Sequence, residues 1–334
     1  QFAEEIASGE ASAVLMVGAE ALNTLFGRLS QGLDLDAWQD DSGDAPTMLG
    51  DAKPAASAHE ISYGIHTPAT TYALFENALR GKYGLNLEQH KAKLGELYQR
   101  FNQVAASNPL SWFPTARSAK EIASVSLSNR YVGFPYTKYL NSIIRVNMGA
   151  AVIMTSLTKA RELGIADERM VYLHGCADAN DIWNVSDRRD YCSSPAMHAI
   201  GKKALSMANK TLDEIDHFDI YSCFPSAVQI ACDELGLSTD DPRGLTVTGG
   251  LPYFGGPGNN YVTHAIASMM NTLRNDTGSF GLLNGNGWFT TKHSMGIYST
   301  TPITKDWQRE PPSSYQQAIL DTPHPKFTEV ANGA

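Results

Sequence analysis

Glycine and proline dominate one short segment, residues 249–258 (GGLPYFGGPG), and a helical pattern follows it at 259–274. Glycine lets a backbone turn with positive φ or approach another group very closely. The segment is therefore predicted to be a loop that turns with positive φ or comes very close to another group. Its side chains, and those of neighbouring loops, are the first candidates for chemistry.

Two other side chains stand near predicted loops. His293 closely follows GLLNGNGWF, and no helix is expected to bury it, so its imidazole could act as a general base. The alternative is a surface histidine beside Lys292. Cys223 has no cationic neighbour in sequence that would lower the pKa of its thiol, so we expect it to be buried and inert. His264, inside the helix after the glycine loop, is expected to be packed.

Strand and helix patterns alternate along the chain, which predicts a parallel or mixed sheet with helices outside it. Strands are predicted at 12–22 (buried and parallel), 145–165 (a strand running into a helix), 170–178, 217–224, 279–289 and 294–300. Helices are predicted at 71–84, 86–107, 195–210, 226–237 and 259–274, and an exposed loop at 32–60. Ligands bind at the carboxyl ends of strands in such sheets. The loops after Phe218–Tyr221, Val247–Gly249 and Leu282–Leu283 should therefore converge on one side.

Composition excludes several classes of protein. The 334 residues predict about two domains or two fused halves, and 43% hydrophobic residues can bury a core. A net charge of −9 with no basic run argues against nucleic-acid binding. No apolar run is long enough to predict a membrane span. The 4 cysteines show no CxxC spacing, which predicts no metal site, no disulfides and a reducing, cytoplasmic location.

Several segments together resemble, in order and spacing, the motifs of the thiolase superfamily, especially its sterol-carrier-protein-type and thiolase-like branch. SGEASAVLMVGAEAL resembles the helix end and strand after the nucleophile, and FPYTKYLNSIIRVNMGAAVIMTSLTKARELGI resembles the end of the loop domain and the next strand. IDHFDIYSCFPSAVQIACDELGL resembles the NEAF or HDCF segment. GGLPYFGGPGNNYVTHAIASMMNTLR resembles GGxxAxGHPxGxSG, and GLLNGNGWF lies where the family has its C-x-G-G loop. The resemblance covers about residues 1–300.

The resemblance implies an α/β thiolase fold: two related βαβαβαββ halves in a five-layered αβαβα arrangement, with an inserted helical loop domain. It divides the chain into a remnant of the N-terminal half (1–22), the loop domain (23–145), the last strand and helix of the N-terminal half (146–166), the C-terminal half (167–300) and a Pro-rich linker or trailing arm (301–334). It also implies truncation before Gln1, where the family carries its nucleophilic cysteine, and a further domain after the arm in longer relatives.

Three positions depart from the family pattern. Gly256 stands where the histidine of GHP is expected, Asn284 lies near the acid/base cysteine of the C-x-G-G loop, and Tyr221 replaces the Asn or His that holds the oxyanion water. Thiolase chemistry needs a cysteine thiolate, an activating histidine, a second acid/base and an oxyanion hole. The departures imply that the usual catalysis is lost, while Gly255 and Gly256 could still admit a thioester closely.

Other groups could replace the lost ones. Resemblance to thiolase-fold steroid-acyl-CoA retro-aldolases implies that Tyr221 and Tyr253 act as acid/base or oxyanion donors. The alternative for each is a buried or half-buried tyrosine whose hydroxyl is already satisfied. His293 would replace the imidazole, and Cys223 and Phe224 match positions that line the pantetheine tunnel in the family.

Three functions follow from the resemblance. The first is a thiolase-like, acetyl-CoA acetyltransferase-like enzyme for acyl transfer or thiolytic cleavage of a 3-oxoacyl-CoA in lipid or sterol side-chain metabolism. The second is an acyl-CoA retro-aldolase that uses tyrosine, and the third is a catalytically silent CoA-binding protein. Coenzyme A or acyl-CoA would be the substrate, with no permanently bound cofactor. The implied partners are a second copy, in a homodimer or tetramer, or a small OB-fold (DUF35-type) protein.

Overall fold

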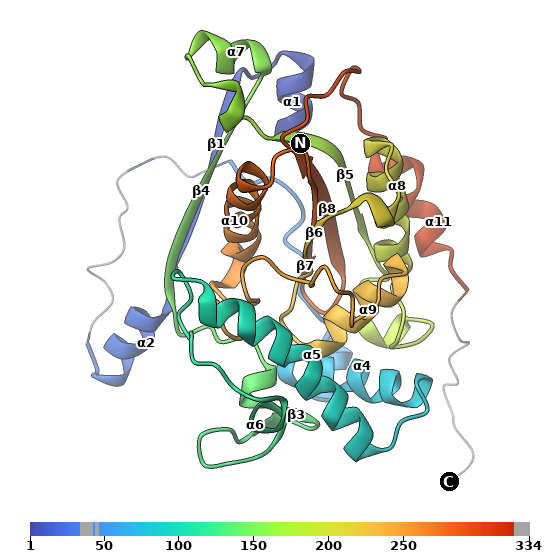
Figure 1. Cartoon of the computed structure of the whole chain (residues 1–334). Helices are drawn as coiled ribbons and strands as arrows, with labels where there is room; N and C mark the ends of the chain where they lie inside the picture. Colours follow the sequence, from blue (N-terminus) through green and yellow to red (C-terminus); the bar gives the residue numbers. More distant parts are fainter. Residues whose placement is uncertain (34–42, 44–46, 324–334) are drawn as a thin grey trace.

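The computed structural model describes residues 1–33, 43 and 47–323, and its elements lie in layers (Figure 1). A two-stranded sheet of β1 (Ala13–Ala21) and β4 (Asn147–Thr155) lies on one side of α10 (Tyr261–Asn275). A four-stranded sheet lies on the other side of α10. Helices α8 (Pro195–Ala208) and α9 (Pro225–Leu235) cover the far face of that sheet (Figure 1).

The four-stranded sheet is mixed, as predicted. In spatial order its strands are β5 (Tyr172–Asn180), β8 (Lys292–Ser299), β7 (Phe280–Gly287) and β6 (His217–Asp219). β6 and β7 are parallel, and the other pairs are antiparallel. The strand predicted at 217–224 is too long, because the Ile220 N–H donates to the Leu245 carbonyl at 2.9 Å instead of extending the ladder, and Pro225 begins α9.

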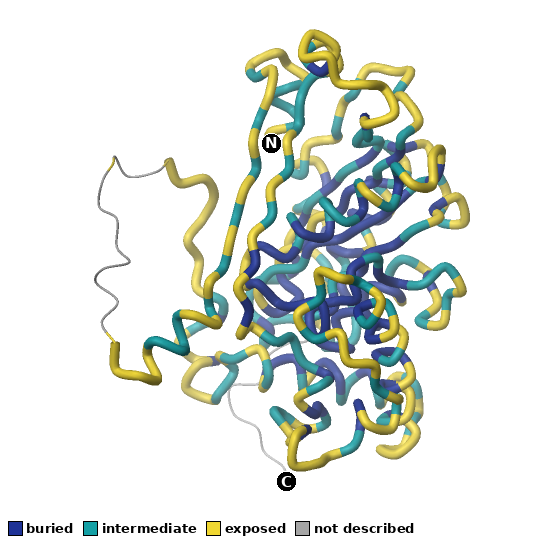
Figure 2. The backbone as a smooth tube through the Cα atoms, turned by 60° about the vertical axis from the view of Figure 1, so that its left-hand side comes forward, coloured by how far each residue is buried: buried dark blue, intermediate teal, exposed yellow. Residues whose placement is uncertain are grey.

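The strand predicted at 12–22 forms, but its predicted parallel pairing and burial are wrong. β1 runs antiparallel to β4, with Ala13 opposite Thr155. Its alternate residues face outward, and Leu15 is 62% and Val17 71% exposed. Figure 2 shows this pair of strands as exposed and intermediate, beside the buried core of the larger sheet. The described residues place a helix layer, α10, on only one face of the pair, so the other face is not buried.

A group of helices at one end of the larger sheet covers its strand-end loops (Figure 1). The group comprises α4 (Pro68–Lys82), α5 (Leu87–Ser107) and α6 (Ala119–Ala123). The predicted helices 71–84 and 86–107 are thus confirmed, and Asn86 and Gln89 form a capping box at the start of α5. The remaining elements are α1 (Phe2–Ser8), α2 (Leu22–Ser30), α3 (Ala58–Ser62), β2 (Tyr131–Gly133), β3 (Tyr136–Thr137), α7 (Leu157–Glu162) and α11 (Gln316–Leu320).

One buried carboxylate joins these helices to the sheet. Glu76 of α4 is fully buried and accepts hydrogen bonds from Gln229 of α9 at 2.8 Å and from the Tyr136 hydroxyl at 2.8 Å. The same carboxylate lies 2.7 Å from His90 Nε2 on α5. A buried charge is tolerated when it is paired and hydrogen-bonded in this way. The network fixes α4 and α5 over the strand-end loops.

The C-terminal segment lies against the body of the protein as far as it is described. The Tyr315 hydroxyl donates to the Asp178 carbonyl at 2.9 Å, and Ile319 of α11 is buried. The part of the predicted arm after residue 323 and residues 34–42 and 44–46 of the loop predicted at 32–60 lie outside the described residues. The end of that predicted loop is wrong, because α3 begins at Ala58 and Glu60 is buried, where it accepts the Ser57 N–H at 2.8 Å. The proposed domain boundaries stay predictions. Within the described residues, no helix has the length and apolar character needed to cross a membrane.

Candidate functional site

The glycine-rich segment packs closely against the chain itself. Gly249 has φ 107°, and a Cβ added there would collide with the backbone and side chain of Ala105 on α5. Gly255 has φ 134°, and a Cβ there would meet the Met148 sulfur on β4. Both residues are therefore required to be glycine by conformation and by space. The close approach inferred from the sequence is confirmed, and the neighbours are the protein's own residues. Contact of a thioester with Gly255 stays a prediction.

The resemblance expects an imidazole at the position of Gly256, and a neighbouring segment fills the space beside this residue. A Cβ built on Gly256 would collide with the Ser142 hydroxyl. The Gly256 N–H donates to the Ile143 carbonyl at 3.0 Å, which fixes the two segments together. The Ser142 N–H in turn donates to the Cys223 carbonyl at 3.0 Å. The absence of a side chain at Gly256 is thus part of the packing of three segments.

This packing predicts a coupled pair of substitutions. Gly256→Ala alone should lower the free energy of unfolding by about 1–3 kcal/mol, because the new methyl group overpacks the Ser142 hydroxyl. In a Ser142→Ala background the same change should cost clearly less, since the Ser142 Cβ is 3.5 Å from the new atom. Urea unfolding of the four proteins measures the coupling. Purely additive effects would contradict the contact.

Asp219, which the sequence analysis did not single out, organises the loop before the glycines. The strand end predicted at Val247–Gly249 is wrong, because residues 245–250 form no strand. They are held by the Asp219 carboxylate, which accepts from the Thr246 hydroxyl at 2.9 Å, the Val247 N–H at 3.0 Å and the Tyr261 hydroxyl at 2.9 Å. Burial raises the Asp219 pKa above its ordinary value, although these donors oppose the shift. The sequence did offer one indication of this role, because Asp219 is an acidic residue inside the apolar run HFDIYSCF.

Tyr221 follows β6 directly and lies against an apolar cluster that joins β4, the glycine loop and α10. The cluster, called the loop cluster below, comprises Val146, Met148, Leu251, Phe254, Tyr261 and Ala265, with Phe113, Tyr221 and Cys223 packed on it. The Tyr221 ring meets the Tyr261 ring edge-on, with centroids 5.4 Å apart. Its hydroxyl has no hydrogen-bond partner among the described residues. Burial raises the pKa of Tyr221, so the phenol remains a proton donor at neutral pH.

Tyr253, the second predicted acid/base, is placed differently. It is 1% exposed, and its hydroxyl donates to the Tyr139 carbonyl at 2.9 Å. That arrangement matches the alternative of a buried tyrosine with a satisfied hydroxyl. Asn284 is also engaged, because its Oδ1 accepts the Tyr221 N–H at 3.0 Å. The structure thus brings Asn284 and Tyr221 together, and the amide serves to fix the loop that carries the phenol.

Cys223 and Phe224 lie in the same loop as Tyr221. Cys223, expected to be buried, is half-buried. Desolvation raises the pKa of its thiol to about 12, so the thiol is protonated at neutral pH. Phe224 is 2% exposed and stacks on Tyr72 of α4, with ring centroids 4.6 Å apart. Their predicted contact with a pantetheine chain is untested.

The expectation that no helix buries His293 is wrong. His293 lies within β8 and is 4% exposed, on the side of the sheet that α8 covers. Its Nε2 lies 3.1 Å from Asp181 Oδ2 and 3.4 Å from the hydroxyl of Ser194, the N-cap residue of α8. Burial acts to raise the pKa of Asp181. The hydrogen bond between Asp181 and His293 opposes this effect, and the pKa of Asp181 lies below its ordinary value. No hydrogen bond among the described residues joins His293 to Tyr221. His264 is packed as expected, 9% exposed beside Phe254.

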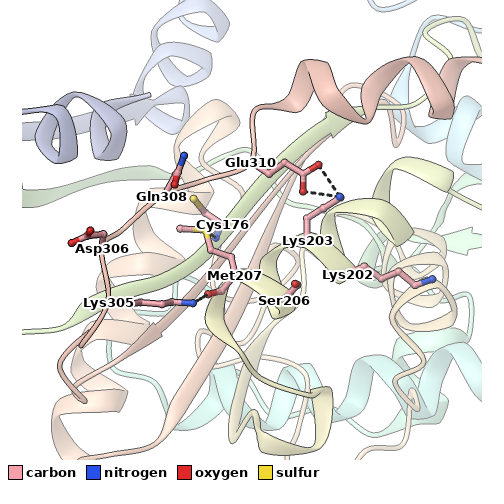
Figure 3. Close-up of a pocket in the computed structure, with 9 residues that line it drawn as sticks. All are labelled: Cys176, Lys202, Lys203, Ser206, Met207, Lys305, Asp306, Gln308 and Glu310. Atoms are coloured by element: carbon pink, nitrogen blue, oxygen red, sulfur yellow. Dashed lines mark hydrogen bonds and ion pairs between the residues drawn. The ribbon is translucent and has the colours of Figure 1, made fainter.

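A hollow lies elsewhere, between α8 and the C-terminal segment (Figure 3). It encloses about 430 Å³ and is lined by Cys176, Lys202, Lys203, Ser206, Met207, Lys305, Asp306, Gln308 and Glu310. Lys203 already pairs with Glu310 at 2.7 Å, and Lys305 donates to the Met207 carbonyl at 2.7 Å. None of the predicted site residues lines this hollow. Within the part of the chain that is described, no cluster of His, Cys, Asp or Glu could hold a metal ion.

Comparison with known proteins gives one match by sequence and several by structure, while no family model matches. The chain is 24% identical over 192 residues to an acetyl-CoA acetyltransferase of Methanothermobacter thermautotrophicus, a match covering 58% of this chain and 47% of the relative. It superposes on a monomeric SCP2-thiolase-like protein type 1 from Mycobacterium smegmatis with TM-score 0.84 and 38% identity. That superposition covers 99% of this chain and 65% of the other.

Two more distant structures share the fold. The Ltp2–ChsH2(DUF35) aldolase superposes with TM-score 0.68 at 18% identity, covering 91% of this chain and 76% of the other. The dimeric peroxisomal thiolase of Saccharomyces cerevisiae gives TM-score 0.59 at 14% identity, covering 89% and 72%. This chain spans about half of the acetyltransferase and just under two thirds of the M. smegmatis protein. With the layered fold and the order of its strand-end loops, these matches show that the chain has the thiolase fold and belongs to the thiolase superfamily.

Proposed function

We propose that this chain forms an acyl-CoA site in which the Tyr221 phenol donates a hydrogen bond to the thioester oxygen. One observation carries the proposal: Tyr221 holds a protonated hydroxyl, without a partner among the described residues, at the carboxyl end of β6. A fixed donor of this kind stabilises the negative charge that develops on a thioester oxygen when an enolate forms. The apolar surroundings of the loop cluster strengthen such an interaction.

The reaction class that fits best is carbon–carbon cleavage of a β-hydroxyacyl-CoA by a retro-aldol route. In that reaction a base, which bound water can supply, takes the β-hydroxyl proton as the β carbon becomes a carbonyl. The Cα–Cβ bond breaks, and its electron pair moves to the thioester as an enolate, which is then protonated at Cα. A phenol donor stabilises the enolate oxygen, and no cysteine nucleophile is needed. Thiolysis would instead need an imidazole to activate a thiolate, and Gly256 leaves no room for one beside Ser142. Acetyl transfer, the activity named for the M. thermautotrophicus relative, is therefore our less favoured alternative.

A silent CoA-binding protein is the second candidate. It is favoured by the engagement of the other predicted groups, since Tyr253 and His293 already have hydrogen-bond partners inside the fold. We further propose a small OB-fold partner of the DUF35 type, because the Ltp2 neighbour is named with one, and a second copy is the alternative. The free state of the described cysteines supports a reducing location such as the cytoplasm.

Calorimetric titration with acetyl-CoA, followed by two turnover assays, tests the proposal. We expect acetyl-CoA to bind and a branched β-hydroxyacyl-CoA to release its carbonyl product, while acetoacetyl-CoA with free CoA is not cleaved. Binding without either turnover would support the silent candidate. Failure of acetyl-CoA to bind would contradict the proposed function, and cleavage of acetoacetyl-CoA would contradict the retro-aldol assignment.

A further inference from the structure

Resting on the proposed function, we infer that the Ser142 hydroxyl is a second hydrogen-bonding group of the same site and contacts bound acyl-CoA beside Tyr221. Ser142 lies in the segment between β3 and β4, far from the strand-end loops in sequence. Neither its residue type nor its local pattern distinguishes it from other loop serines. Only folding of the chain brings Ser142 close to these loops.

Backbone hydrogen bonds hold Ser142 between the two loops that form the site. The Ser142 N–H donates to the Cys223 carbonyl at 3.0 Å, in the loop that carries Tyr221. On the other side the Gly256 N–H donates to the Ile143 carbonyl at 3.0 Å, in the glycine loop. The serine backbone is therefore fixed, and its side chain projects into the space that a Cβ at Gly256 would occupy.

The Ser142 hydroxyl is a free group in apolar surroundings. No hydrogen bond among the described residues involves its oxygen, and the side chain is half-buried rather than sealed in. The neighbouring loop cluster, which includes Val146, Leu251 and Phe254, is apolar. A hydroxyl next to such a surface is stabilised when a partner reaches it. Acyl-CoA offers matching carbonyl groups in its thioester and in the amides of its pantetheine arm.

Gly256 and Ser142 are complementary in this arrangement. The absence of a side chain at Gly256 opens the space, and the serine hydroxyl occupies it. A small neutral hydroxyl thus stands where the resemblance expects a bulky titratable imidazole. Such a group can hydrogen-bond a carbonyl but cannot generate a thiolate, which agrees with a site that binds a thioester without using a cysteine nucleophile.

The test is calorimetric titration of acetyl-CoA and of free CoA into wild type and Ser142→Ala. Loss of one hydrogen bond should weaken acetyl-CoA binding roughly 2- to 10-fold. A loss confined to acetyl-CoA would assign the contact to the thioester, and an equal loss for both ligands would assign it to the pantetheine amides. Ser206→Ala is the matched control, because it removes an exposed serine hydroxyl from the groove in Figure 3 and should change neither affinity.

The outcomes separate this inference from the proposed function. If wild type fails to bind acetyl-CoA, the proposed function is wrong. If wild type binds and Ser142→Ala binds equally well, only the role of Ser142 is overturned. Urea midpoints of all proteins confirm that they are folded, and Ser142→Gly, which also removes the hydroxyl without adding volume, replaces the alanine variant if that protein is unstable.

Discussion

Tyr221→Phe is expected to lower kcat for cleavage of a β-hydroxyacyl-CoA by roughly 10²- to 10³-fold, the usual contribution of one hydrogen-bond donor to a developing oxyanion. The substitution removes only a hydroxyl that has no partner among the described residues, so the ring can keep its edge-on contact with Tyr261. Acetyl-CoA affinity should therefore change by much less than kcat. Steady-state kinetics together with calorimetry measure the two effects separately.

Two comparisons make this result specific. Tyr83→Phe is the matched control, because it removes a half-buried phenol hydroxyl that donates to Asp233 at 2.9 Å, outside the loop cluster. It should leave kcat unchanged. A large loss of kcat in Tyr253→Phe, combined with full activity in Tyr221→Phe, would show that the acid has been assigned to the wrong tyrosine.

The pH dependence of the same reaction offers a further comparison. Burial raises the pKa of Tyr221 above the ordinary value of about 10. Activity that depends on the protonated phenol should then persist through pH 10 and fall only at higher pH. A loss of activity near pH 7, with the protein still folded, would point to a different titrating group.

Asp219→Ala is expected to lower the free energy of unfolding by about 2–4 kcal/mol, the largest stability effect among these predictions. The carboxylate accepts from backbone N–H groups of Val247 and Thr248 at 3.0 and 3.2 Å and from the Tyr261 hydroxyl at 2.9 Å. Alanine leaves the Val247 N–H without its acceptor. The other two donors lose the carboxylate and keep only threonine hydroxyls, with Thr248 N–H 3.2 Å from Thr246 Oγ1 and the Tyr261 hydroxyl 2.7 Å from Thr248 Oγ1. Urea unfolding measures the loss.

The raised pKa of Asp219 determines how its contribution to the free energy of unfolding changes with pH. The unfolded chain loses this proton at lower pH than the folded protein, so the contribution of Asp219 is fully present below about pH 4 and falls as pH rises through the folded value. The difference in stability between wild type and Asp219→Ala should therefore be larger at about pH 3.5, close to the ordinary pKa of an aspartate, than at about pH 7. Asp219→Asn, which keeps one acceptor, should cost less than alanine. Equal stability of all three proteins would contradict the network.

Local sequence patterns correctly predicted those elements that depend mainly on residues close together in the sequence. The periodic apolar residues predicted α5, and the structure adds Asn86 as its N-cap. Gly236, with φ 74°, ends α9 as a C-cap glycine should. The alternation of strands and helices predicted a mixed sheet. The glycines of 249–258 correctly indicated a close approach, because only glycine tolerates the φ values and the contacts found there.

The rest depended on contacts between distant segments. Ser142 contacts Gly256, and Asp219 accepts a hydrogen bond from Val247. Both contacts join loops that are distant in sequence, so no local sequence pattern predicts them. His293 was misplaced because its burial depends on Asp181 and on the N-terminus of α8. The direction of β1 depended on its pairing with β4, which follows it by more than a hundred residues. The family motifs pointed to the loops in which we propose the site, and the chemistry proposed there rests on these tertiary contacts.

The most direct test of the central claim is a crystal structure of the protein with a stable acetyl-CoA analogue in which a methylene replaces the thioester sulfur. We expect the acyl carbonyl oxygen to lie within hydrogen-bond distance of the Tyr221 hydroxyl, about 2.5–3.0 Å. A carbonyl bound away from Tyr221, for example in the groove beside Lys203, would contradict the account.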